Sequence, residues 1–158
     1  MEISLGLVPE KEEYFGLELA LNNNTKISKG LEIGGVNVSE ESRGVQVGAI
    51  NAANELNCGA QIGGMNGAGE SRGVQIGVAN LAIKSNYGVQ IGLIYNYSKK
   101  LRGAQFSPLL NICGEDSKGF QLGLINWRNG NPWYSKLVPI AAIRTNRKKS
   151  IEDNVEVV

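Results

Sequence analysis

The stretch Gly73–Asn80 reads GVQIGVAN, and close variants of it recur along the chain. GVQVGAIN begins at Gly44, and GVQIGLIYN begins at Gly88. Internal repeats of a fixed length indicate an architecture in which one small unit is used again and again. The repeat length and the pattern within each repeat therefore carry most of what the sequence says about the fold.

Aligning the chain on the glycine that opens each unit gives eight units with steps of 14 to 16 residues. The openers are Gly16, Gly30, Gly44, Gly59, Gly73, Gly88, Gly103 and Gly119. Aliphatic residues with two phenylalanines fill the first and third places after the opener, glutamine or glutamate fills the second, and glycine usually fills the fourth. An asparagine follows seven or eight places after the opener.

The alternation apolar–Gln–apolar–Gly has a period of two, which indicates a β-strand. We expect the apolar residues to face a core and the Gln and Gly residues to face the other way. On that interpretation Ile76 is a core residue, and Ile76→Ala costs about 2–4 kcal/mol of stability. The polar stretches between these segments predict loops or short strands.

Two all-β folds fit such a repeat. In a β-solenoid each unit forms one coil of 14–16 residues, and like positions stack about 4.8 Å apart, so the asparagines and the glutamines can form hydrogen-bonded ladders. In an antiparallel meander or eight-stranded β-barrel, each unit forms one strand and the aliphatic residues face lipid. The solenoid is favoured because every unit carries the same residue type at the same place. This identity stabilises the structure most when equivalent residues of neighbouring units lie directly over one another, as they do in a solenoid.

The repeat pattern divides the chain into a repeat domain at 16–127 and atypical ends. Residues 1–15 are expected to cap the first coil and residues 128–143 the last, because an uncapped solenoid exposes a sheet edge. Trp127, Trp133 and Tyr134 form an aromatic patch at the second end. Residues 144–158 are expected to be a mostly flexible, solvated tail.

Composition excludes several classes of function. The formal net charge is +1, with 16 Lys and Arg against 15 Asp and Glu, which argues against a nucleic-acid partner. The chain has no histidine and no recognisable catalytic, phosphate-binding or metal-binding motif. We therefore expect no catalytic residues, no cofactor and no metal site, and a protein that is not an enzyme.

The Gln/Glu places form the candidate binding face, on which a protein or a glycan would be held. These residues are Glu18, Glu32, Gln46, Gln61, Gln75, Gln90, Gln105 and Gln121. Glu18 and Glu32 would be adjacent in stacked coils and could together perform acid–base chemistry or bind a cation, so a carbohydrate-active solenoid is a further alternative. A basic residue before several openers, as at Arg43 and Arg72, predicts a rim of weak ion pairs.

The units GLEIGGVN, GVQVGAIN, GVQIGVAN and GFQLGLIN resemble the GLQIGLxN surface-repeat proteins of spirochaetes and Bacteroidetes. The resemblance covers nearly the whole chain and implies a bacterial envelope or surface protein of unassigned activity. It brings no catalytic residues. Residues 1–9 do not have the pattern of a signal peptide, so a cytoplasmic location is the alternative, while membrane association and oligomeric state are left open.

Overall fold

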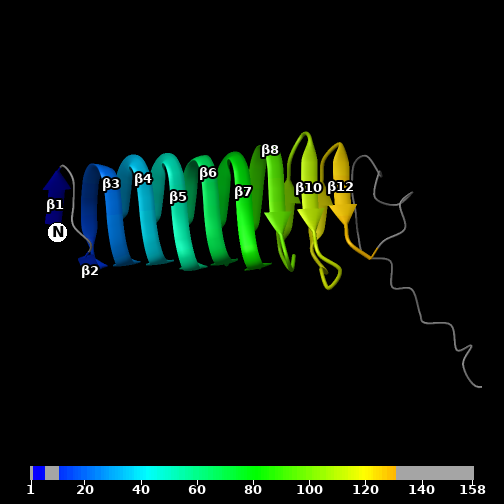
Figure 1. The fold of residues 1–158 in the computed structure, drawn as a ribbon, viewed down its shortest axis with the longest axis horizontal. Coiled ribbons are helices and arrows are strands. Elements are labelled where there is room, and N and C mark those ends of the chain that lie inside the picture. The colour runs from blue at the N-terminus through cyan, green and yellow to red at the C-terminus, as the bar shows by residue number, and fades with distance from the viewer. Residues whose placement is uncertain (1, 6–10, 131–158) are drawn as a thin grey trace, which may run out of the picture.

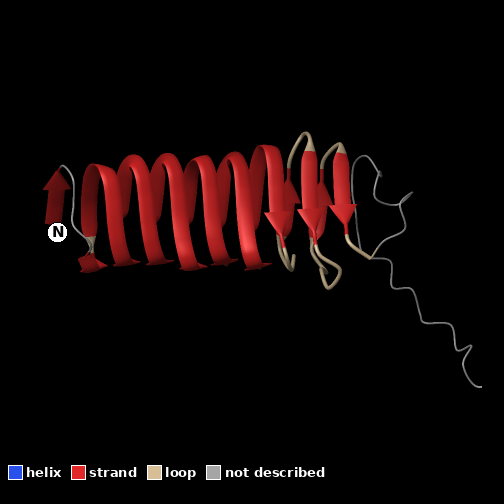
Figure 2. Cartoon of the chain, viewed as in Figure 1, coloured by secondary structure: helices blue, strands red, loops and turns tan. Residues whose placement is uncertain are grey.

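The computed structural model describes residues 2–5 and 11–130, and these residues form strands without any helix (Figures 1 and 2). Their bounds are β1 (Glu2–Leu5), β2 (Lys11–Tyr14), β3 (Gly16–Ser28), β4 (Leu31–Ser42), β5 (Val45–Asn57), β6 (Ala60–Ser71), β7 (Val74–Asn86), β8 (Val89–Ser98), β9 (Ala104–Phe106), β10 (Leu110–Cys113), β11 (Phe120–Leu122) and β12 (Ile125–Arg128).

The eight repeat units form eight coils stacked along the long axis of the molecule, so the fold is a β-solenoid (Figure 1). Strands β3 to β8 supply the first six coils, β9 with β10 the seventh, and β11 with β12 the eighth. Every pairing between described strands is parallel. The alternative of an antiparallel meander or barrel is therefore wrong.

Matched places of the repeat lie directly over one another. Gln61 pairs in register with Gln75, and Asn66 pairs with Asn80. The register shifts where a unit carries an extra residue, as between Ala53 and Leu56. Units of different length can therefore stack because the additional residue is accommodated at a bend.

Each coil has three straight sides. Along 31–43, buried residues alternate with partly or fully exposed ones, except at 33–36 and 40–41, where successive residues are all partly or fully exposed. These breaks in the alternation mark corners between a first side (31–34), a second side (36–39) and a third side (41–43). We use these names for the equivalent residues of every coil.

The interior is lined with polar and small side chains, opposite to the expectation from the sequence. The side chains of Gln75 and Asn80 are completely buried, whereas Ile76 is 40% exposed. The prediction that the aliphatic residues form the core is therefore wrong. The large loss of stability predicted for Ile76→Ala no longer follows, because the Ile76 side chain is not buried. Alternation with period two separates two faces of a strand but does not say which of them is inside.

Glycine at the fourth place explains why this face is the inner one. A Cβ atom at Gly48 would lie 2.6 Å from the carbonyl oxygen of Gly34 and 2.7 Å from the Asn37 amide nitrogen. The interior at this level is occupied by the stacked asparagine amides, and at Gly48 only a residue without a side chain leaves room for them. Gln and Gly share one face, so both point into the narrow space enclosed by the coil.

The asparagines form a continuous ladder through the interior. Each Nδ2 donates to the Oδ1 of the asparagine in the next coil, from Asn23 to Asn126, with donor–acceptor distances of 2.6–2.9 Å. The same nitrogen also donates to a main-chain carbonyl, as Asn80 does to Ile91 at 2.9 Å. The predicted asparagine ladder is confirmed.

The ends of the chain are described only in part. Strand β1 pairs with β3 from Glu2↔Gly16 onward, and β2 pairs with the later part of β3. The described residues of the predicted cap at 1–15 thus add one more layer of parallel strands to the first coil. The predicted cap at 128–143 lies outside the described residues except for 128–130, and the predicted tail at 144–158 lies outside them entirely.

Replacing Asn80 by alanine is expected to destabilise the protein far more than Ile76→Ala. The Asn80 change removes three hydrogen bonds and leaves buried partners unsatisfied, at a cost of about 3 kcal/mol. Ile76→Ala removes a half-exposed side chain and is expected to cost about 1 kcal/mol. Chemical denaturation of both variants measures the difference, and a larger cost for Ile76→Ala would contradict the polar interior.

Candidate binding surface

The predicted binding face lies inside the solenoid. All eight side chains of the Gln/Glu column, from Glu18 to Gln121, have an exposed fraction of 0%. The structure does bring them together in one column, but no partner can reach them from solvent. The prediction that these residues form a binding face is therefore wrong. They form a second interior ladder, as the sequence analysis also allows for stacked glutamines.

The glutamine ladder runs opposite to the asparagine ladder. Each Gln Nε2 donates to the side-chain oxygen of the preceding coil at 2.7–2.9 Å, from Gln121 down to Glu32. Asparagine side chains donate toward the following coil instead. The two rows of amide dipoles therefore oppose each other, and each buried amide satisfies its neighbours rather than a ligand.

Glu32 and Glu18 occupy the N-terminal end of this ladder. Glu32 accepts a hydrogen bond from Gln46 at 2.7 Å through Oε2. Burial raises the pKa of the Glu32 carboxyl, hydrogen bonds from Gln46, Ser28 and Thr25 act in the opposite direction, and the nearby Glu18 charge raises it further. Both carboxyl groups are enclosed, so acid–base chemistry on a polysaccharide would require an opening that these coils do not provide.

The outward surface of the first side is an unbroken apolar ladder. Its side chains lie at the first and third places after each opener, and Ile62, Ile76 and Ile91 are each about 40% exposed (41%, 40% and 43%). The ladder consists of Leu17, Leu19, Leu31, Ile33, Val45, Val47, Ala60, Ile62, Val74, Ile76, Val89, Ile91, Ala104, Phe106, Phe120 and Leu122. We call this row the first apolar face.

Apolar residues continue around the corner onto the second side. Leu21, Leu93 and Leu124 at the corner are 79%, 62% and 59% exposed. The second side presents residues such as Val38, Leu81 and Ile112 outward. Contiguous apolar surface of this extent is rare on monomeric soluble proteins and marks sites of contact with another surface.

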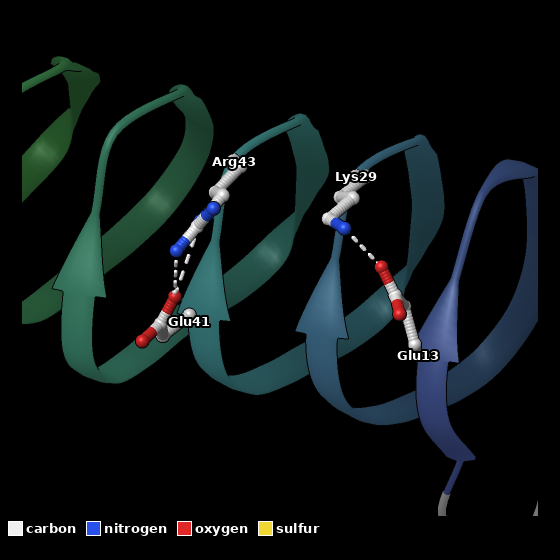
Figure 3. Close-up of polar contacts among 4 residues, drawn as sticks. All are labelled: Glu13, Lys29, Glu41 and Arg43. Carbon is white, nitrogen blue, oxygen red and sulfur yellow. Dashed lines mark hydrogen bonds and ion pairs between the residues drawn. The ribbon is translucent and has the colours of Figure 1, made fainter.

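The third side carries the charged residues. Lys29 and Glu13 pair between neighbouring coils, and Arg43 pairs with Glu41 of its own coil at 2.8 Å (Figure 3). Arg72 and Glu70 form a similar pair at 2.6 Å. The predicted rim of ion pairs is confirmed for these residues, and such exposed pairs contribute little to stability.

Aromatic residues concentrate toward the C-terminal coils. Tyr95 and Tyr97 stack with ring centroids 6.5 Å apart, and Phe106 lies 6.0 Å from Phe120. Trp127 is 40% exposed and donates from Nε1 to Asn129 Oδ1 at 2.9 Å. The other members of the predicted aromatic patch, Trp133 and Tyr134, lie outside the described residues.

A search of the described residues finds no group of three or more His, Cys, Asp or Glu side chains able to hold a metal ion. In that same part of the chain, no helix is long and apolar enough to cross a membrane.

Comparison with known proteins gives no match: no family model, no curated protein and no solved structure is significantly similar to this chain. The resemblance to GLQIGLxN surface-repeat proteins therefore stays a prediction.

The sequence pattern does not predict the exposed apolar faces, because aliphatic residues of an alternating strand are normally the buried ones. One signal could have indicated them: Gly48 shares the face of Gln46, and glycine belongs where another backbone approaches closely. A face that alternates a long amide with glycine thus indicates the crowded inner side of a narrow coil.

The raised pKa of Glu32 predicts that stability depends on pH. The folded state holds this proton more tightly than the unfolded state does. The stability due to the group is therefore fully present below the ordinary glutamate pKa of 4.5 and is lost as pH rises through the raised pKa of the folded state. Glu32→Gln keeps the size and supplies a donor toward Glu18. We expect the variant to unfold at a higher temperature than the wild type at pH 8, with a smaller difference at pH 4.

The matched control is Glu55→Gln, because Glu55 lies exposed on a neighbouring coil. This change is expected to leave the unfolding temperature almost unaltered at both pH values. A wild type that is more stable at pH 8 than Glu32→Gln would show that the carboxylate is charged and stabilising in the folded protein.

Proposed function

We propose that this protein is a non-catalytic repeat scaffold of the bacterial envelope or surface, whose work is to present its apolar faces to a partner. The observation that supports it most directly is the first apolar face, in which aliphatic residues half-exposed to water line up over all eight coils. Burying such residues in the interior would be the ordinary way to stabilise a fold. Their outward position favours contact with another surface.

The interior supports a scaffold role because it leaves little freedom to the outer surface. Two ladders of buried amides join each coil to the next at donor–acceptor distances below 3 Å. The coils are thereby held in register, and the outer side chains form straight, evenly spaced rows. A rigid surface binds a matching surface with little loss of conformational entropy.

The same observations change the kind of partner that we propose. An aliphatic surface lacks the hydrogen-bonding groups that hold a glycan, so a protein partner is favoured over a glycan. The enclosed carboxyl groups of Glu18 and Glu32 weaken the alternative of a carbohydrate-active solenoid. The envelope location rests on the sequence resemblance alone.

Lysine substitutions on the first apolar face test this proposal. The double variant Ile76→Lys, Ile91→Lys places two charges among half-exposed side chains, so we expect each change to alter stability by no more than about 1 kcal/mol. The native wild type is expected to bind an apolar fluorescent dye, and the double variant to bind clearly less. Dye fluorescence, together with circular dichroism, measures both effects.

The matched control is Glu55→Lys, because Glu55 is exposed at the corner between the second and third sides of its coil. This variant is expected to bind as much dye as the wild type. Fractionation of the producing bacterium tests the location, for which recovery in the envelope fraction is expected. Absence of dye binding by the folded wild type would contradict an accessible apolar surface. Release of reducing sugar ends from a polysaccharide, abolished in Glu32→Gln, would instead favour the enzyme alternative.

A further inference from the structure

The outward residues of the second side change in size along the solenoid. One column lies eight or nine places after each opener, between the buried asparagine and the next buried residue. In coil order it contains Asn24, Val38, Ala52, Gly67, Leu81, Tyr97, Ile112 and Trp127. The side chains are small in the third and fourth coils, next to the middle of the solenoid, and large throughout the C-terminal half.

We infer that a second copy of this chain packs on the second side in the antiparallel direction, about a two-fold axis between the coils of Gly67 and Leu81. This deepens the proposed function by naming the partner, and it rests on that proposal. Around such an axis Gly67 of each copy faces Leu81 of the other, and Ala52 faces Tyr97. Farther out, Val38 faces Ile112 and Asn24 faces Trp127.

Within this column, the pairing places a large side chain opposite a small one near the axis. Leu81 would fill the space that Gly67 leaves, and the Tyr97 ring would cover Ala52. Alternating large and small residues across facing positions is what allows two layers to interdigitate without voids or overlap. A two-fold interface must be self-complementary in this sense, because the same patch is used by both copies.

The spacing of the coils adds a second argument. Adjacent strands lie about 4.8 Å apart in any sheet, so two copies have ridges of the same pitch along their whole length. Every coil of one copy can then meet a coil of the other, as in the dry interfaces between stacked sheets. A partner with a different periodicity would lose this match after a few coils.

The available area is enough for a reversible dimer. Eight coils span about 38 Å at about 4.8 Å each, and the second side with its corner is about 16 Å wide at about 3.3 Å per residue. This gives a footprint of roughly 600 Å² on each copy and about 1,200 Å² in total, the lower limit for stable interfaces. The dimer is therefore expected to depend on concentration.

A lipid surface is a less suitable occupant. Helices and patches that lie on membranes usually combine an apolar side with an excess of Lys and Arg. The charged side here pairs cations with anions, as in Arg43–Glu41 and Arg72–Glu70, and the whole chain has a formal net charge of only +1. Nothing in this distribution favours an anionic membrane.

Gly67→Leu tests the interface without disturbing the coil. A Cβ atom at Gly67 would have only one neighbour within reach, the Asn51 carbonyl oxygen at 4.0 Å, so a side chain can extend outward. In the dimer it would collide with Leu81 of the second copy. Sedimentation equilibrium of the full chain is expected to show a monomer–dimer equilibrium for the wild type and a dissociation constant at least about tenfold higher for Gly67→Leu.

Two further variants make the result specific. Ala60→Leu adds the same side chain in the same coil but on the first apolar face, and it is expected to leave the dissociation constant unchanged. Gly67→Leu combined with Leu81→Ala exchanges the large and small partners across the axis, and it is expected to restore dimerisation. Circular dichroism checks that each variant is folded.

The inference is overturned if the wild type stays monomeric at millimolar concentration. It is also overturned if the monomer binds phosphatidylcholine vesicles and no dimer forms. Dimerisation weakened by Ala60→Leu and not by Gly67→Leu overturns it as well, because the first face would then be the interface. Failure of the exchanged double variant to dimerise overturns the antiparallel arrangement. The dye-binding test on Ile76 and Ile91 reports on the proposed function separately, since those residues lie on the other face.

Discussion

The hydrogen bond between one asparagine amide and the next is the interaction on which the solenoid depends. The amide nitrogen of Asn66 donates to Asn80 at 2.8 Å, and the same geometry repeats from coil to coil. A buried amide without partners costs several kcal/mol, whereas in this ladder each amide from Asn37 to Asn126 is donor and acceptor at once. The ladder exists only if every coil places an asparagine at the same point, which is why the sequence repeats its motif so faithfully.

The other interior residues follow from this constraint. Gly48 leaves the space in which the amides of Asn37 and Asn51 meet, and the glutamines form a second ladder, of opposite hydrogen-bond direction, on the first side. Along the second side the interior is closed by small residues such as Ala53, Ala68 and Ala82, which are 0–3% exposed. The narrow polar interior leaves little room for large aliphatic side chains: Leu101 is buried, whereas the aliphatic residues of the first side lie outside.

The sequence was sufficient to predict the coil, its parallel stacking and its asparagine ladder, because these depend only on spacing and on identity at matched places. It was not sufficient to predict which side of the strand faces inward. That depends on a balance between burying aliphatic surface, as at Ile76, and satisfying stacked amides, as at Gln75, and alternation along a strand is compatible with either outcome. The predicted binding face is wrong for the same reason: the alternation alone is compatible with Glu32 and Gln46 on the outside, whereas both are buried.

The inversion of inside and outside has a consequence for the shape of the outer surface. In an ordinary domain the core fixes the aliphatic residues, and the surface is free to vary. Here hydrogen bonding fixes the interior, so the residues free to change are the outward ones, as the column from Ala52 and Gly67 to Tyr97 and Trp127 shows. Shape on the outer faces can therefore differ from coil to coil within one fold, which is what the proposed packing of a second copy on the second side requires.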